Sequence, residues 1–397
     1  MHQSAPDPWP RVLHLTQPVD GGVARVVGDL ARAQLAAGMH VTVACPDSAL
    51  ADRLRAAGAD VRLWRATRSP GPSLAGEVRR LARVVADVRP HLVHAHSAKA
   101  GLAGRLVVRG RIPTVFQPHA WSFEAVGGAT AALALAWERR GARWAHRTVC
   151  VSEAERATGV RAGIDGRWAV VPNGVDPERF RPADGPAARA ALLPDVPAEV
   201  PLAVCVGRLC RQKGQDVLLA AWEAVRARVP GALLVLVGDG PDRDRLRPSP
   251  AVRLVGAVPD AAPWYRAADL VVLPSRWEGM ALAPLEAMAC GRPVVVTDVD
   301  GARESLPSAL RPHCLVPPEE PAALAEAVAR LLLDAPLRAS LGRRARRHIV
   351  SAHDARHTAA AIAALYRDLL GGGPGARVGS GPGARVAPTE YRESIHS

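Results

Sequence analysis

The sequence has little lysine, few aromatic residues and no long apolar run. Lys99 and Lys213 are the only lysines among 51 basic residues, and aromatic side chains make up 4% of 397 residues. Nucleic-acid bases stack on aromatic side chains that alternate with basic ones, so this scarcity argues against a nucleic-acid partner. No stretch reaches the roughly 18 apolar residues of a membrane-spanning helix. Residues 1–10 lack the apolar segment of a secretory signal, which favours a cytoplasmic protein.

Cysteine is also scarce, and no two cysteines have the C-x-x-C spacing of metal or redox sites. Most of them lie within apolar stretches, which is typical of reduced core residues in a cytoplasmic protein. The six are Cys45, Cys150, Cys205, Cys210, Cys290 and Cys314.

Acidic residues are too few to balance the basic ones, and the net charge is +13. Residues 1–181 hold 25 Lys and Arg against 15 Asp and Glu, whereas residues 182–397 hold 26 against 23. A basic surface attracts nucleic acid, anionic lipid or phosphorylated substrates. A general preference for arginine over lysine in the sequence would give the same number of basic residues without any anionic partner. Both interpretations, a binding surface and a compositional preference, therefore stay open.

Apolar runs of strand length alternate with stretches of helical periodicity along most of the chain. Strands that are buried on both faces read as continuous apolar runs, and the helices between them make the sheet parallel. The pattern predicts two doubly wound α/β domains with Rossmann-like parallel sheets that face each other across a cleft. The expected strands are residues 11–16, 40–46, 61–65, 91–96, 113–119 and 147–152, then 202–208, 232–238, 252–258, 270–275 and 293–298.

Composition gives the expected domain boundaries. Residues 182–201 are rich in Pro and Ala and read as a linker between domains at 1–181 and 202–350. Residues 355–370 have helical periodicity and are expected to pack back on the first domain. Residues 371–397 contain the sequence GPGARV twice, which predicts a disordered tail.

Glycine and basic side chains follow the first strand of each domain. Gly21 and Gly22 form a turn before a helix, where backbone amides can approach an anion. Arg208 and Lys213 follow the strand at 202–208, again beside a helix N-terminus. Positive charge at this position suits a diphosphate, although a solvated basic loop would have the same sequence.

The most informative segment is residues 275–291, which follow a buried strand, turn at a glycine and open a helix. Unpaired backbone donors at the helix start suit a phosphate. These donors belong to Gly279, Met280, Ala281 and Leu282. Glu286, within the helix, suits a ribose diol, whereas Glu278 in the turn suits sugar hydroxyls.

In these motifs the chain resembles family 4 glycosyltransferases of the GT-B fold, the retaining class with an E-x7-E motif. The resemblance covers almost the whole chain. It includes Gly21-Gly22, His119, residues 172–176, 206–208, 213–214, 238–241 and 278–291.

The resemblance implies a role for each matching residue. Arg208 and Lys213 hold the donor diphosphate and stabilise its charge, and Glu278 binds the donor sugar. The others have binding roles: Glu286 for ribose, Gly21 and Gly22 for close approach of the first loop, Val258 for the base, and His119 for the sugar and its departing phosphate.

The resemblance further implies a retaining transfer from a nucleotide-sugar, a UDP-sugar by expectation, to a lipid-linked or cell-surface saccharide. It implies no metal and no other cofactor. A natural-product glycosyltransferase acting on an antibiotic, including a phosphoglycolipid, would use the same donor site. A non-enzymatic nucleotide-sugar binder is the third interpretation, and the intact Glu278, Glu286, Arg208 and Lys213 argue against it.

The acceptor side gives weaker signals. The predicted helix at 74–88 has Arg79, Arg80 and Arg83 opposite an apolar face, a pattern that can lie on an anionic membrane. An ordinary crossover helix has the same pattern. Trp121 and Phe123 are expected to be exposed and to contact lipid or close the acceptor pocket. We therefore expect peripheral attachment to the inner face of the cell membrane.

Overall fold

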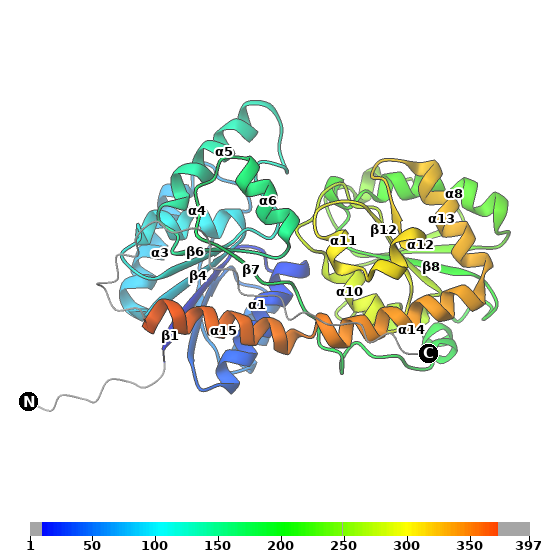
Figure 1. Ribbon diagram of the computed structural model, residues 1–397, viewed down its shortest axis with the longest axis horizontal. Coiled ribbons are helices and arrows are strands. Elements are labelled where there is room, and N and C mark those ends of the chain that lie inside the picture. Colours follow the sequence, from blue (N-terminus) through cyan, green and yellow to red (C-terminus); the bar gives the residue numbers. More distant parts are fainter. Residues whose placement is uncertain (1–9, 248, 372–397) are drawn as a thin grey trace, which may run out of the picture.

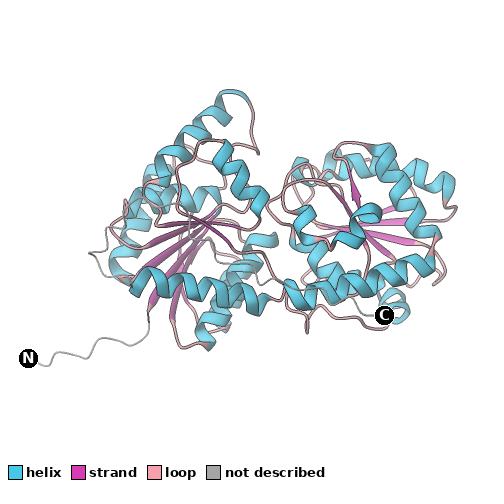
Figure 2. Ribbon diagram, in the orientation of Figure 1, coloured by secondary structure: helices cyan, strands magenta, loops and turns pink. Residues whose placement is uncertain are grey.

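The computed structural model describes residues 10–247 and 249–371, which form two α/β domains side by side (Figure 1). Each domain is a parallel sheet with helices on both faces (Figure 2). This is the expected fold class. No helix in the described ranges combines the length and the apolar character that crossing a membrane requires.

The N-terminal sheet has seven parallel strands in the order β3-β2-β1-β4-β5-β6-β7. Its strands are β1 (Arg11–Thr16), β2 (His40–Cys45), β3 (Asp60–Leu63), β4 (Leu92–His96), β5 (Thr114–Gln117), β6 (Arg147–Cys150) and β7 (Trp168–Val170). Its helices are α1 (Gly21–Ala36), α2 (Ala49–Ala56), α3 (Leu74–Val88), α4 (Ser97–Val108), α5 (Gly128–Ala142) and α6 (Glu153–Arg161). β1 and β4 pair at the centre, and almost all of their side chains are buried.

The C-terminal sheet has six parallel strands in the order β10-β9-β8-β11-β12-β13. They are β8 (Leu202–Val206), β9 (Leu233–Val237), β10 (Val252–Gly256), β11 (Leu270–Leu273), β12 (Val294–Thr297) and β13 (Leu315–Val316). The helices are α7 (Gly185–Leu192), α8 (Gln215–Arg228), α9 (Ala262–Ala267), α10 (Leu282–Ala289), α11 (Ala302–Ser305), α12 (Arg311–Cys314) and α13 (Pro321–Leu333), with short 3-10 turns η1 (Arg211–Lys213), η2 (Arg243–Arg245) and η3 (Ser308–Leu310).

Two long helices connect the domains along one side of the molecule (Figure 1). α14 (Ala335–Ala352) packs on α10 and α13 of the C-terminal domain, and α15 (Ala355–Gly371) returns to pack on α1 of the N-terminal domain. The phenol of Tyr366, on α15, is buried and lies 2.6 Å from Nδ1 of His94 on β4.

The structure adds detail that the sequence pattern did not predict. β7 and β13 were missed because they have only three and two residues, and most of their side chains are partly buried. The expected linker contains α7, which packs on α9 and buries Arg189 against the carbonyl of Ala267. All six cysteines are buried and unpaired, as expected. Residues 372–397, the expected tail, lie outside the described residues.

Candidate active site

The glycine-containing loops after the first strand of each domain both pack near the start of α10. Gly22 opens α1, and a Cβ atom there would lie 3.7 Å from Leu282 Cδ1 at the start of α10. Gly214 has φ +66°, and a Cβ on it would clash with the Pro274 carbonyl oxygen. Glycine at 214 therefore lets η1 close against the loop that carries Glu278.

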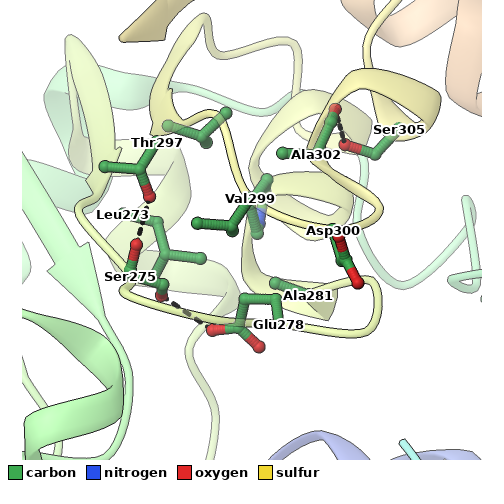
Figure 3. Close-up of a pocket in the computed structure, with 11 residues that line it drawn as sticks. Leu273, Ser275, Glu278, Ala281, Thr297, Val299, Asp300, Ala302 and Ser305 are labelled. Atoms are coloured by element: carbon green, nitrogen blue, oxygen red, sulfur yellow. Dashed lines mark hydrogen bonds between the residues drawn. The ribbon is translucent and has the colours of Figure 1, made fainter. Parts of the chain in front are cut away.

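Lys213 and Glu278 form an ion pair within this junction. Lys213 Nζ lies 2.5 Å from Glu278 Oε1, and the Ser275 hydroxyl donates to the same oxygen at 2.7 Å. Both charged side chains are mostly buried. Glu278, Ser275 and neighbouring residues line a cavity of about 10 Å³ (Figure 3). That is room for about one water molecule, so a sugar would have to bind on the cleft side of Glu278.

Arg208 follows β8. Within the described ranges its guanidinium has no hydrogen-bond or ion-pair partner, while its carbonyl oxygen accepts from Gln215 Nε2 at 3.0 Å. Arg68, on the loop between β3 and α3, approaches it from the other domain. Partial burial and the neighbouring charge of Arg208 both lower the pKa of the Arg68 guanidinium. Two cations from opposite domains are therefore near enough to repel each other.

Glu286 is buried on α10 and both of its carboxylate oxygens have partners. Arg25, on α1 of the other domain, donates to Oε1, and the Tyr265 hydroxyl donates to Oε2 at 2.8 Å. Sequence reasoning missed Arg25, Tyr265 and Arg68. The one available signal was that Arg25 lies a helical turn after Gly22 and so shares its face of α1.

The backbone of the loop before α10 also contacts the N-terminal domain. The carbonyl of Gly279 accepts from the Ser152 hydroxyl at 3.0 Å, and that of Met280 accepts from Asn173 Nδ2 at 2.7 Å. Ala281 is the N-cap of α10 and has no side-chain cap. Val258 follows β10 and packs, partly buried, on the core of the C-terminal domain. The binding roles expected for these residues stay predictions.

Contacts across the domain interface continue at α6 and α11. The Glu304 carboxylate accepts from the backbone amides of Glu153 and Ala154, at 2.7 and 2.9 Å, and so caps α6 from the other domain. Thr158 donates to Asp300 at 2.8 Å. A carboxylate at a helix N-terminus is favourable, so these contacts hold the domains together.

His119 follows β5 in a strained loop. His119 and Ala120 have φ of 57° and 92°, conformations that cost about 1–3 kcal/mol each in non-glycine residues. The Ala120 amide donates to Glu155 Oε1 at 2.6 Å, which fixes the turn against Gly279. Burial lowers the pKa of His119 to about 3, so its imidazole is neutral.

The expectation that Trp121 is exposed was wrong. Its side chain is 1% exposed, and its indole N–H donates to the Glu155 carbonyl at 2.8 Å. The ring packs against Phe116, Phe123 and Trp168. Trp121 therefore supports the His119 loop from within the domain and cannot contact lipid.

The sequence matches two family models of glycosyltransferases. Residues 20–179 match glycosyltransferase family 4, and residues 200–334 match the glycosyl transferases group 1. A phosphatidylinositol monomannoside mannosyltransferase from Mycobacterium tuberculosis, described as GDP-mannose-dependent and α-(1-6), is 32% identical over 82% of this chain and 89% of its own length. A D-inositol 3-phosphate glycosyltransferase from Salinispora tropica is 38% identical over 46% of this chain and 42% of its own, so the chain spans less than half of that relative.

Solved structures share the fold at lower identity. Anabaena HepE in complex with UDP and glucose has a TM-score of 0.78 at 23% identity, over 90% of this chain and 100% of that one. Sucrose-phosphate synthase from Thermosynechococcus elongatus has a TM-score of 0.77 at 24% identity, over 91% and 99%. The architecture is therefore GT-B. Together, these matches show that the chain belongs to the family 4, group 1 glycosyltransferases.

Proposed function

We propose that the protein transfers a sugar from a nucleotide-sugar to a hydroxyl of an inositol-phosphate type of acceptor, with retention of the anomeric configuration. The donor site is supported by one observation above all. The Gly22 turn lies against Leu282 at the start of α10, Lys213 pairs with Glu278 just before this helix, and Arg25 pairs with Glu286 within it.

The charges favour departure of a diphosphate. As the glycosidic bond breaks, negative charge develops on the leaving phosphate, where preorganised cations lower the barrier. Arg208 and Lys213 follow β8 on one side, and Arg68 approaches from the other domain. The acceptor hydroxyl attacks the anomeric carbon, and its proton passes to the leaving phosphate on the same face. This route needs no metal and no pair of carboxylates flanking the bond, in contrast to glycosidases.

Binding of the nucleotide should raise the melting temperature of the protein. We expect UDP or GDP at about 100 times its Kd to stabilise the fold by about 2.7 kcal/mol. Differential scanning fluorimetry with UDP-, GDP- and dTDP-sugars measures the shift in melting temperature and identifies which nucleotide base the protein prefers. Adenosine monophosphate, which lacks the diphosphate, serves as the control. If no nucleoside diphosphate shifts the transition, the proposed donor site is wrong.

The acceptor is supported by the relatives and by charge. Both relatives described above carry inositol phosphate or phosphatidylinositol in their names. The N-terminal domain, which faces the donor site, holds most of the basic excess, and a phosphate on the acceptor would be attracted to it. We further propose that the protein lies peripherally on the anionic inner face of the membrane. The exposed arginines of α3 support this: Arg79, Arg80 and Arg83.

Vesicles test the acceptor and the membrane together. Phosphatidylinositol vesicles should carry the protein upward in flotation at low salt and release it as salt screens the charges. With a radiolabelled donor, the lipid should become labelled. Replacing Arg79, Arg80 and Arg83 with serine should reduce flotation, whereas replacing Arg226 and Arg228 of α8 should not. If soluble inositol phosphate is labelled but the protein does not float with the vesicles, only the membrane proposal is contradicted. If neither the lipid nor soluble inositol phosphate is labelled, the proposed acceptor is wrong.

A further inference from the structure

Four buried or partly buried side chains in the N-terminal domain form one continuous hydrogen-bonded chain. Gln34, on α1, directs Oε1 to Nε2 of His14, on β1, at 2.8 Å. Nδ1 of His14 lies 3.0 Å from Nε2 of His96, at the end of β4. Nδ1 of His96 lies 3.2 Å from Nε2 of His119. The chain thus runs from α1 through β1 and β4 to the His119 loop after β5.

The chain has one direction. A neutral imidazole carries a single N–H, so the nitrogen that donates fixes the other as an acceptor. Because the Gln34 oxygen can only accept, His14 must donate from Nε2 and accept at Nδ1. The same reasoning then places the proton of His96 on Nε2, and that of His119 on Nε2. His14 therefore donates from Nε2 to Gln34, His96 donates from Nε2 to Nδ1 of His14, and His119 donates from Nε2 to Nδ1 of His96.

The neutral state that this reasoning requires is favoured by burial. His14 and His96 are fully buried. Burial lowers the pKa of His14 to about 4 and holds that of His96 well below its ordinary value, with the neighbouring His94 and His14 adding to the effect on His96. None of the rings in the chain carries charge near neutral pH, so a single tautomer of each can persist.

A metal ion would be the other use for such a cluster. Ring nitrogens of His14, His94 and His96 lie within 4.8 Å of one another. However, the facing nitrogens of His14 and His96 are 3.0 Å apart, which fits one shared proton, whereas zinc–nitrogen bonds of about 2.0 Å on each side need more room. The rings of His94 and His96 are stacked with centroids 4.0 Å apart, so their in-plane lone pairs do not converge on one point. The geometry favours hydrogen bonding.

We infer that Gln34, His14 and His96 are positioning residues that fix His119 as its Nε2–H tautomer, with Nδ1 as a hydrogen-bond acceptor toward the cleft. Nδ1 of His119 has no partner within the described ranges, and it is not among the buried unpaired atoms. The adjacent Ala120 lies against Gly279, beside the donor loop.

This assignment narrows what His119 can bind. A neutral imidazole that presents a lone pair accepts from a hydroxyl, but it cannot donate to a phosphate oxygen. The sequence suggested contact with both the sugar and its departing phosphate, whereas the chain of tautomers selects a hydroxyl of the donor or acceptor sugar. The assignment of a sugar hydroxyl as the ligand rests on the proposed function, whereas the assignment of the histidine tautomers does not.

Nitrogen-15 NMR of the ligand-free protein, labelled only at histidine, reads each tautomer directly from the chemical shifts of the two ring nitrogens. We expect Nε2–H for His14, His96 and His119 in the wild type, assigned by single histidine substitutions. In Gln34→Met the His14 proton loses its acceptor, so the His119 signals should shift toward a mixture of tautomers. Leu35→Met, on the same helix, should leave them unchanged. An Nδ1–H tautomer of His119, or identical His119 signals in wild type and Gln34→Met, would overturn the inference.

Turnover tests the consequence separately. Gln34→Met should lower kcat/KM by about tenfold, the equivalent of one hydrogen bond, while Leu35→Met keeps the wild-type value. Unchanged turnover beside altered tautomers would overturn the positioning role. An inactive wild type with the expected tautomers would instead count against the proposed function. Elemental analysis completes the test, because one bound metal per chain would replace the hydrogen-bonded chain.

Discussion

Lys213→Ala is expected to lower kcat/KM by about 100- to 1000-fold, the typical loss when a preorganised group is removed from a developing negative charge. Lys213, on η1 after β8, is held by the tight Gly214 turn and by its ion pair with Glu278. Its ammonium therefore needs no rearrangement as the diphosphate departs. The loss should fall mainly on kcat, because the charge on the phosphate grows only as the glycosidic bond breaks.

Steady-state kinetics and thermal unfolding should be measured together for this variant. Removing Lys213 also leaves the mostly buried Glu278 with the Ser275 hydroxyl as its remaining partner, so some loss of stability is expected. Arg211→Ala is a matched control, since it removes a cation from the same short turn at an exposed position. Equal effects of the two substitutions on kcat would refute a specific role for Lys213.

The expected fold agrees with the structure because its signal is local. Strands such as β1 and β4 are buried on both faces, so the chain must be apolar along their whole length, and the sequence shows this. β7 and β13 lie at the edges of their sheets, where short, half-buried strands leave no such pattern. Helix α7 was hidden by the Pro- and Ala-rich composition of its surroundings.

Residues of the candidate site were predictable where a local motif carries them, as at Gly22, Lys213 and residues 278–286. The residues at 278–286 are adjacent in sequence, and their motif carries the signal. Arg25 and Arg68 reach the site from the other domain, and nothing in their local sequence shows which residues they face. Trp121 was misjudged for a related reason: aromatic residues in a loop look exposed until tertiary packing places neighbours around them.

The second large effect is expected on donor binding, when Glu286, the partner of Arg25, is replaced. Glu286→Ala is expected to raise the donor KM by about 100-fold, because hydrogen bonds from ribose hydroxyls to a carboxylate contribute about 1.5–3 kcal/mol each. Both carboxylate oxygens already accept one bond, from Arg25 and from Tyr265. Each oxygen keeps a further lone pair, so ribose can bind without displacing these two residues.

Arg25 and Tyr265 therefore position the Glu286 carboxylate, and this role can be tested separately from the binding of ribose by Glu286 itself. Arg25→Met should raise the donor KM by about tenfold, and combining it with Glu286→Ala should add little, because Arg25 acts through the carboxylate. Arg32→Ala, on the same helix with an exposed side chain, is the control.

Inhibition by UDP and by its 2′,3′-dideoxy analogue gives the decisive comparison. Wild type should prefer UDP strongly, and Glu286→Ala should bind both alike, since only the diol distinguishes them. A preference for UDP that survives in Glu286→Ala would show that ribose is bound elsewhere, and Arg25 would then serve only to hold the two domains together.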